Sequence, residues 1–287
     1  MTLKLYPTPA HFLSDNHDFL HRNPIVTQLN QNNASATPDA PCTPQLLFGR
    51  CESQNRPLLL FGNVSPWNLC LNAPHGQDEE VRKAAAALAQ YLQTEKIPIT
   101  GVSGREDLCQ PFMEAWDGQF QLHTAMDIMV LRHLLDPPNV NGQVRLARLE
   151  DLETIARWMC AFTHEALREP CQVSDRMDRD RQHIEAGRTW IMENEEGELV
   201  STARTTREMP GGICVSAVYT PPEHRGKGYC QNTVAGLCRR QFQQGKEYCT
   251  LFVDRANPFS NRAYKKIGFE VLEDSSDYRL ISPTESQ

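Results

Sequence analysis

The chain has 287 residues, enough for one large or two ordinary domains. Its formal net charge of −7 argues against nucleic acid or an anionic membrane as the main partner. No apolar run approaches the roughly 20 residues that span a bilayer, and the N-terminus lacks an apolar core of signal-peptide length. We therefore expect a cytoplasmic protein. None of its ten cysteines forms a C-x-x-C pair, so we expect no metal site.

The N-terminal half alternates strand-like and helix-like stretches. Its clearest helix has Val81, Leu88 and Leu92 on one apolar stripe. The expected elements are strands at 45–50, 57–63 and 67–71, a helix at 78–95, a strand at 97–102, a helix at 105–116 and a β-like stretch at 119–134.

A linker or wide turn divides the chain at Asp136 to Gly142, where two prolines, two asparagines and a glycine occur together. We expect one domain at residues 1–140 and a second at residues 143–287.

The C-terminal half opens with a strand from Gln143 and a helix that carries an apolar stripe from Leu152 to Met159. A charged helix, a hairpin and a β-rich run follow. The expected elements are the charged helix at 174–187, the hairpin strands at 190–193 and 199–206, the β-rich strand at 213–219, a helix from 230, a strand at 248–253, and a short helix from 258 that ends at 267–269.

The junction "VYTPPEHRGKGYCQ" between the β-rich run and the next helix is suited to an anion. Gly226 and Gly228 allow positive φ and close approach of a ligand to the backbone. Free N–H groups at the start of the helix attract negative charge, and Arg225 and Lys227 add positive charge. The expected ligand is a phosphate or pyrophosphate.

The junction resembles the acyl-CoA loop of the GNAT acetyltransferase superfamily, R/Q-x-x-G-x-G/A. Arg225 and Gly228 match this pattern, while Cys230 replaces its last small residue. Downstream, Asn257 follows a strand, and Tyr264 precedes the terminal pair Gly268-Phe269, which resembles the second GNAT signature. The likeness covers roughly residues 143–282. It implies an α/β fold with a mixed sheet, a GNAT acyl-CoA N-acyltransferase fold in the C-terminal half.

The resemblance also implies a chemistry. An N-acetyltransferase of this kind takes acetyl-CoA as acyl donor, and a primary amine attacks the thioester directly. The family's acid, which protonates the departing thiolate, corresponds to Tyr264, whose phenol we expect to have a normal pKa near 10. The positions implied for cofactor binding are Val218, Tyr219, Thr220, Arg225, Gly226, Lys227, Gly228, Tyr229, Cys230 and Asn257.

The general base stays open. The strand at 213–219 has no carboxylate, although many family members carry one there. Glu208, Glu165, Glu169 and His164 are candidates, although a solvated surface charge is the favoured interpretation of each. Water suffices if the acceptor amine has a low pKa.

Three functions compete at this point. The favoured one is acetyl transfer to a small-molecule or protein amine, with no nucleic acid or membrane partner and an undetermined oligomeric state. A second is acyl transfer from bulkier acyl-CoA donors, as in glycine N-acyltransferases. A third is a non-catalytic acyl-CoA sensor, in which the loop binds but nothing reacts.

The N-terminal half resembles the degenerate first module of tandem GNAT proteins. Three of its elements precede their counterparts in the C-terminal half by about 147 to 151 residues, as an internal duplication would leave them. Where the second half has its Gly loop, the first has "PHGQDEE". The carboxylates of Asp78, Glu79 and Glu80 would repel a pyrophosphate, so we expect residues 1–140 to lack a cofactor site.

Overall fold

The computed structural model describes residues 1–74 and 79–281. The chain folds into two compact units. Unit 1 contains residues up to Ile128, the short segment Val253–Ala256 and the residues from Val271 on. Unit 2 contains Met129–Phe252 and Asn257–Glu270. Among the described residues, no helix combines the length and the apolar character needed to cross a membrane.

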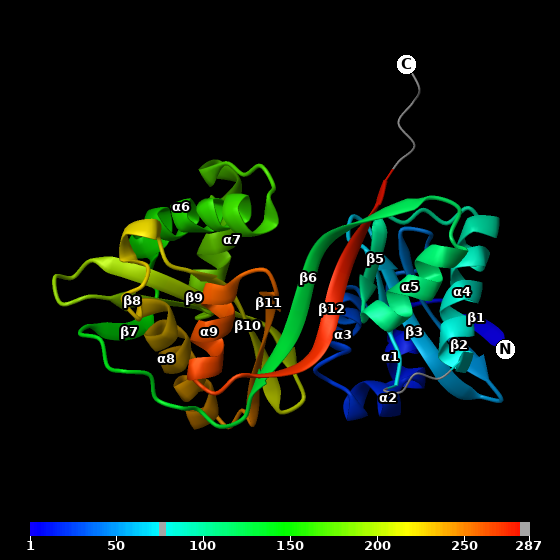
Figure 1. Ribbon diagram of the computed structural model, residues 1–287, viewed down its shortest axis with the longest axis horizontal. Helices are drawn as coiled ribbons and strands as arrows, with labels where there is room; N and C mark the ends of the chain where they lie inside the picture. The colour runs from blue at the N-terminus through cyan, green and yellow to red at the C-terminus, as the bar shows by residue number, and fades with distance from the viewer. Residues whose placement is uncertain (75–78, 282–287) are drawn as a thin grey trace, which may run out of the picture. The chain divides into compact units, whose positions relative to one another are not determined.

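Unit 1 is a mixed sheet with helices on both faces (Figure 1). Its neighbouring strands follow the order β1-β2-β3-β4-β5-β12, antiparallel except for the parallel pair β4 and β5. The strands are β1 (Thr2–Leu5), β2 (Leu46–Ser53), β3 (Arg56–Val64), β4 (Leu69–Asn72), β5 (Gly101–Gly104), β12 (Glu270–Ile281) and β6 (Gln119–Leu131), whose last three residues belong to unit 2. The helices are α1 (Pro9–Asp15), α2 (His17–Arg22), α3 (Gln28–Ala36), α4 (Glu79–Thr94) and α5 (Glu106–Ala115).

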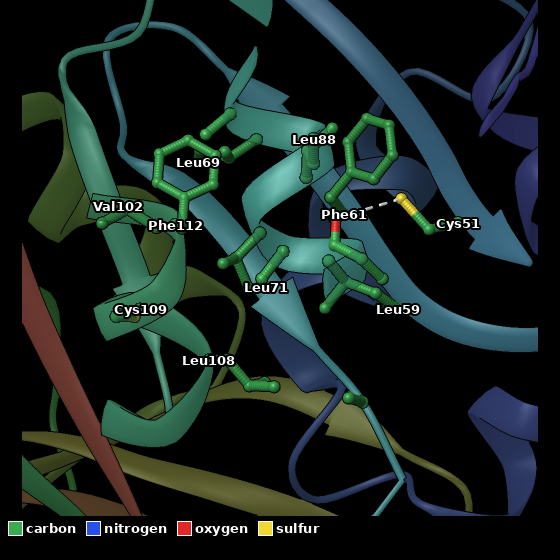
Figure 2. Close-up of a cluster of buried hydrophobic side chains, with 14 of the residues drawn as sticks. Cys51, Leu59, Phe61, Leu69, Leu71, Leu88, Val102, Leu108, Cys109 and Phe112 are labelled. Atoms are coloured by element: carbon green, nitrogen blue, oxygen red, sulfur yellow. Dashed lines mark hydrogen bonds between the residues drawn. The ribbon is translucent and has the colours of Figure 1, made fainter. Parts of the chain in front are cut away.

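The main core of unit 1 lies between the sheet and helices α4 and α5 (Figure 2). Strand residues alternate between the two faces, so Leu59 and Phe61 pack in this core while Leu60 packs against α1 to α3 on the other side. On α4, small alanines next to Leu88 allow the helix to approach the sheet closely. The apolar stripe predicted for this helix is confirmed.

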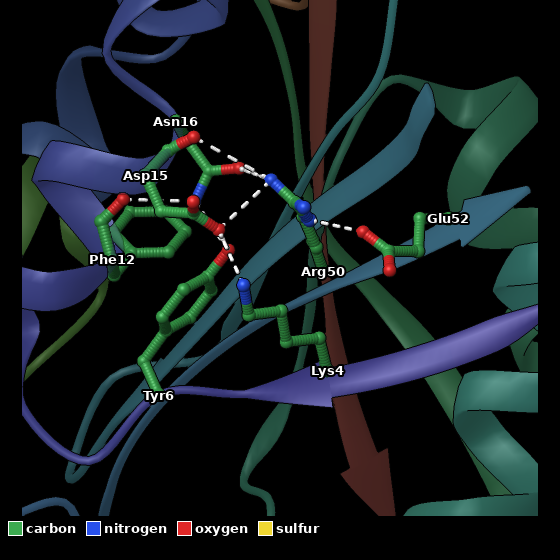
Figure 3. Close-up of polar contacts among 7 residues, drawn as sticks. All are labelled: Lys4, Tyr6, Phe12, Asp15, Asn16, Arg50 and Glu52. Carbon is green, nitrogen blue, oxygen red and sulfur yellow. Dashed lines mark hydrogen bonds and ion pairs between the residues drawn. The ribbon is translucent and has the colours of Figure 1, made fainter. Parts of the chain in front are cut away.

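A polar network joins the first strand and helix of unit 1 to β2 (Figure 3). Arg50 is only 8% exposed, and it donates to Glu52 and contacts Asp15 at 3.0 Å. Asp15 also accepts from Lys4 and from the Tyr6 hydroxyl, at 2.8 and 2.6 Å. Because the buried Arg50 guanidinium pairs with both Glu52 and the more exposed Asp15, its charge is compensated and the network stabilises the fold.

Unit 2 contains strands whose neighbours follow the order β11-β10-β9-β8-β7. Helices α6 and α7 pack on one face of these strands, and α8 packs on the opposite face. The strands are β7 (Gln143–Leu146), β8 (Thr189–Glu193), β9 (Leu199–Met209), β10 (Gly212–Tyr219) and β11 (Tyr248–Asp254). The helices are α6 (Leu152–Phe162), α7 (Val173–Glu185), α8 (Tyr229–Gln243) and α9 (Pro258–Lys266).

The two halves of the chain repeat one order of elements: a strand, helices, three strands, a helix, a strand, a helix and a last strand. The strand pairing repeats as well, because β4 and β5 are parallel like β10 and β11, while the preceding pairs are antiparallel in both halves. The first residues of α4 and α8 are 150 positions apart, and those of α5 and α9 are 152 apart. The predicted mixed α/β fold with a GNAT-like first half is confirmed.

Some predicted elements differ from the structure. The strand predicted at 97–102 begins only at Gly101, because Pro98 lacks an N–H and its carbonyl accepts from the Asn63 side chain. The strand β1 and helices α1 to α3 were not predicted, although Thr8 before Pro9 is a helix-start signal. Of the loop expected to exclude a pyrophosphate, His75 to Asp78 lie outside the described residues, and Glu79 and Glu80 form the first turn of α4.

Candidate functional site

The site begins where β10 stops pairing with β11. The two strands pair in parallel over three residue pairs, the last being Cys214 with Thr250. Further along β10, the register with β9 shifts between Ser216 and Tyr219, which marks a β-bulge. Ala217 in this bulge has φ of 48°, in the left-handed region that L-residues seldom adopt. The end of β10 therefore has a backbone edge that an extended ligand can pair with.

The Gly loop follows this edge directly. After a short 3-10 turn (Pro222–His224), Arg225 is extended, and Gly226 and Gly228 have φ of 78° and 86°. Gly228 is the N-cap of α8, which begins at Tyr229, one residue before the predicted start. In a turn with left-handed residues, successive N–H groups can point toward one concave side, and the start of the helix adds its free N–H groups. A loop of this kind is suited to an anion such as a phosphate or pyrophosphate.

Arg225 is held by the residues around it. Its Nε donates to the Thr220 carbonyl at 2.9 Å, and its guanidinium lies 5.7 Å from the centre of the Tyr219 ring. One terminal nitrogen pairs with Glu165 at 2.6 Å. The guanidinium is therefore fixed beside the Gly loop, although about half of the side chain is exposed. Lys227 is exposed.

Tyr264 lies on α9 and is buried against Phe269, with 5.9 Å between ring centres. Burial raises the pKa of Tyr264 well above its usual value of 10, and the nearby Cys230 thiol raises it further. The expectation of a normal pKa is therefore wrong, because the sequence does not show how deeply a residue on a terminal helix is buried. Burial also raises the pKa of Cys230, to about 12, so this thiol stays protonated at neutral pH.

Asn257 is the N-cap of α9, and its side-chain oxygen accepts from the Ser260 N–H at 3.1 Å. Its amide oxygen therefore has a structural role at the start of this helix. Val218, Tyr219 and Thr220 lie at the end of β10, where they continue into the Gly loop. Tyr219 is buried, and Val218 and Thr220 are partly buried.

The candidate bases differ in their surroundings. Glu208 pairs with Lys246, which holds the pKa of this carboxyl below its usual range. His164 contacts the Cys171 carbonyl at 3.1 Å. Glu165 contacts two predicted cofactor residues, since it accepts from the Tyr219 hydroxyl at 2.9 Å and from Arg225 at 2.6 Å. Sequence reasoning missed this contact, because Glu165 is 60 residues before Arg225 and no spacing rule connects them.

These contacts arise because unit 2 has a turn of π-helix, Thr163–Leu167, directly after α6. The following residue, Arg168, has φ of 56° and ends the turn. The wider turn changes the direction of the side chains beyond α6, and Glu165 comes to lie beside Tyr219. π-turns of this kind are frequent at functional sites.

Comparison with known proteins agrees with this geometry. Residues 152–269 match a family model described as "Acetyltransferase (GNAT) family". The matched residues include β10, the Gly loop, α8, α9 and Phe269. The chain matches no curated protein sequence.

Three solved structures are similar over nearly the whole chain. A GNAT acetyltransferase from Colwellia psychrerythraea has 11% identity and a TM-score of 0.60, covering 98% of this chain and 100% of its own. A GCN5-related N-acetyltransferase from Sphaerobacter thermophilus has 15% identity and a TM-score of 0.64, with coverage of 98% and 96%. A tandem GNAT protein from the clavulanic acid biosynthesis pathway has 13% identity and a TM-score of 0.55, with coverage of 99% and 100%. At these identities the likeness shows the fold, which the chain carries in both halves.

Proposed function

We propose that the protein transfers the acetyl group of acetyl-CoA to a primary amine, and that the reaction takes place in unit 2. The observation that carries the proposal is the loop with positive φ at Gly226 and Gly228, which joins the bulged end of β10 to the start of α8. A pyrophosphate fits the N–H groups of this loop, and an extended pantetheine arm fits the free edge of β10.

Each part of the site has a task in this reaction. Acetyl-CoA, when bound, supplies the activated thioester. The N–H groups of Gly226 to Tyr229 and the Arg225 guanidinium bind the pyrophosphate. A backbone N–H at the bulged end of β10, near Val218 and Tyr219, stabilises the charge that develops on a carbonyl oxygen. Tyr264 donates a hydrogen bond to the sulfur, and its raised pKa makes full proton transfer harder than for an exposed phenol.

A non-catalytic acyl-CoA sensor is the second candidate function. Two observations favour it. Strand β10 carries no carboxylate that could act as a base, and the raised pKa of Tyr264 makes this phenol a weaker acid toward a departing thiolate. Acyl donors bulkier than acetyl remain compatible with the same loop, because the loop contacts the common CoA part.

We propose that residues 1–140 have kept the fold but bind no cofactor. In unit 1, the Arg105 side chain at the end of β5 donates to the carbonyls of Ala73 and Pro74, which follow β4. This position, between two parallel strands, corresponds to the opening beside β10 in unit 2. The Arg105 guanidinium also pairs with Asp107 and Glu273, and it is buried. A buried arginine therefore fills the place of a pantetheine arm.

A cytoplasmic location agrees with ten free cysteines.

Release of free thiol from acetyl-CoA, measured with a panel of primary amines, tests the enzymatic proposal. The panel should contain polyamines, amino acids, aminoglycosides and peptides with a free N-terminus, and butyryl- and benzoyl-CoA should replace acetyl-CoA in parallel. We expect at least one amine to stimulate thiol release. Calorimetric binding of CoA without stimulation by any amine would support the sensor, and no binding of CoA would contradict both.

A further inference from the structure

Glu165 connects two residues of the cofactor site through one exposed carboxylate. One carboxylate oxygen accepts from the Tyr219 hydroxyl at 2.9 Å, and the other pairs with the Arg225 guanidinium at 2.6 Å. The side chains of Glu165 and Arg225 are 46% and 48% exposed. The carboxylate thus occupies an arginine nitrogen that the proposed function assigns to the pyrophosphate.

An ion pair in this environment is weak enough to exchange its partners. Exposed pairs between arginine and a carboxylate contribute about 0.2–1 kcal/mol, because water screens their attraction. A pyrophosphate carries more charge than one carboxylate, and the N–H groups of the Gly loop hold it as well. The guanidinium itself need not move far, because its Nε keeps the Thr220 carbonyl as a second partner.

We propose that Glu165 occupies the Arg225 guanidinium while CoA is absent, and that the pyrophosphate of the cofactor displaces it. The inference rests on the proposed function. Binding of CoA breaks the pair between Glu165 and Arg225, while the hydrogen bond from Tyr219 to the carboxylate is kept. Cofactor binding thereby changes the contacts of the π-helical turn Thr163–Leu167, which carries Glu165.

The sign of the effect on CoA affinity distinguishes this role from a structural one. If Glu165 competes with the pyrophosphate, Glu165→Gln removes the competitor, and CoA binds about two- to fivefold more tightly. If Glu165 only keeps Arg225 in the correct orientation, the same variant binds CoA less tightly. Isothermal titration calorimetry with CoA at low salt measures the difference, which should shrink at high salt.

Two controls separate the pair from a general change of charge. Glu223→Gln removes one negative charge two residues before Arg225, and among the described residues Glu223 forms no ion pair with it. This control should change the affinity less than Glu165→Gln. In an Arg225→Gln background, Glu165→Gln should increase the affinity for CoA no more than Glu223→Gln does, because the ion pair between Glu165 and Arg225 is already absent.

Hydrogen exchange gives a second readout. Amides in residues 163–168 of the wild-type protein should exchange faster once CoA is bound, because their contact with Arg225 is lost. The variant Glu165→Gln should show no such increase. Weaker or unchanged CoA binding by Glu165→Gln, or slower exchange in this segment on binding, would overturn the inference. Failure of the wild-type protein to bind CoA would instead overturn the proposed function.

Discussion

Substitution of Gly226 by alanine should weaken CoA binding about five- to thirtyfold. Gly226 has φ of 78°, a conformation that costs an L-residue about 1–2 kcal/mol. A Cβ atom at this position would meet nothing within 4 Å, so the backbone strain is the whole effect. The loop is exposed, and an alanine variant can therefore relax when free. CoA binding must restore the conformation that presents the N–H groups, so the free energy of the strain is subtracted from the binding free energy and the affinity falls.

Gly187 provides the matched control. It has φ of 64°, and a Cβ atom there also meets nothing within 4 Å, but it follows α7 and lies outside the loop. Gly187→Ala should lower the thermal midpoint without changing the dissociation constant for CoA. Gly226→Asn should lose less affinity than Gly226→Ala, because asparagine tolerates the left-handed region better. Gly228→Ala adds a contact of 3.1 Å with Val140 and should be the more severe loop variant.

Isothermal titration calorimetry with CoA measures all four variants, and circular dichroism confirms that each is folded. An unchanged dissociation constant in both Gly226→Ala and Gly228→Ala would show that the loop does not bind the pyrophosphate, and the reasoning from φ would be refuted.

Two further predictions concern titrating groups. Tyr264→Phe should lower turnover at least about tenfold and leave the affinity for acetyl-CoA almost unchanged, as measured by steady-state kinetics with a competent amine. If the variant turned over at the wild-type rate, Tyr264 would be a packing residue only. Burial raises the pKa of Glu273 to about 7 from 4.5, so the folded state holds this proton more tightly than the unfolded state. The free energy of unfolding should therefore fall by up to about 3 kcal/mol as pH rises from 4.5 to 7, and Glu273→Gln should remove that part of the slope in denaturant titrations; an identical slope in the variant would contradict the assignment.

Much of the candidate site could be predicted from the sequence because it depends on local rules. Gly226 and Gly228 before an apolar stripe indicate a loop that leads into a helix, and the structure has α8 there. Asn257 followed by Pro258 indicates a helix start, and Asn257 is the N-cap of α9. These signals act over a few residues, which is the range in which sequence patterns carry structural information.

The remaining features depend on contacts that are distant in the sequence. The bulge at Ala217 lacks the glycine or asparagine that would announce a positive φ. Helix α3 is rich in asparagine and glutamine and has no apolar stripe, yet Asn30 on it is buried and donates to Asn72 on β4. Strand β12 pairs with β5 of unit 1, although it follows the elements of unit 2 in the chain. Tertiary contacts decide each of these cases, so no local pattern reveals them.

The structure of the protein in complex with CoA tests the central claim most directly. We predict one CoA per chain, with its pyrophosphate within hydrogen-bond distance of the N–H groups of Gly226 to Tyr229 and of Arg225, and with its pantetheine arm along the end of β10. A CoA bound elsewhere, or a second CoA beside Arg105 in unit 1, would contradict the account.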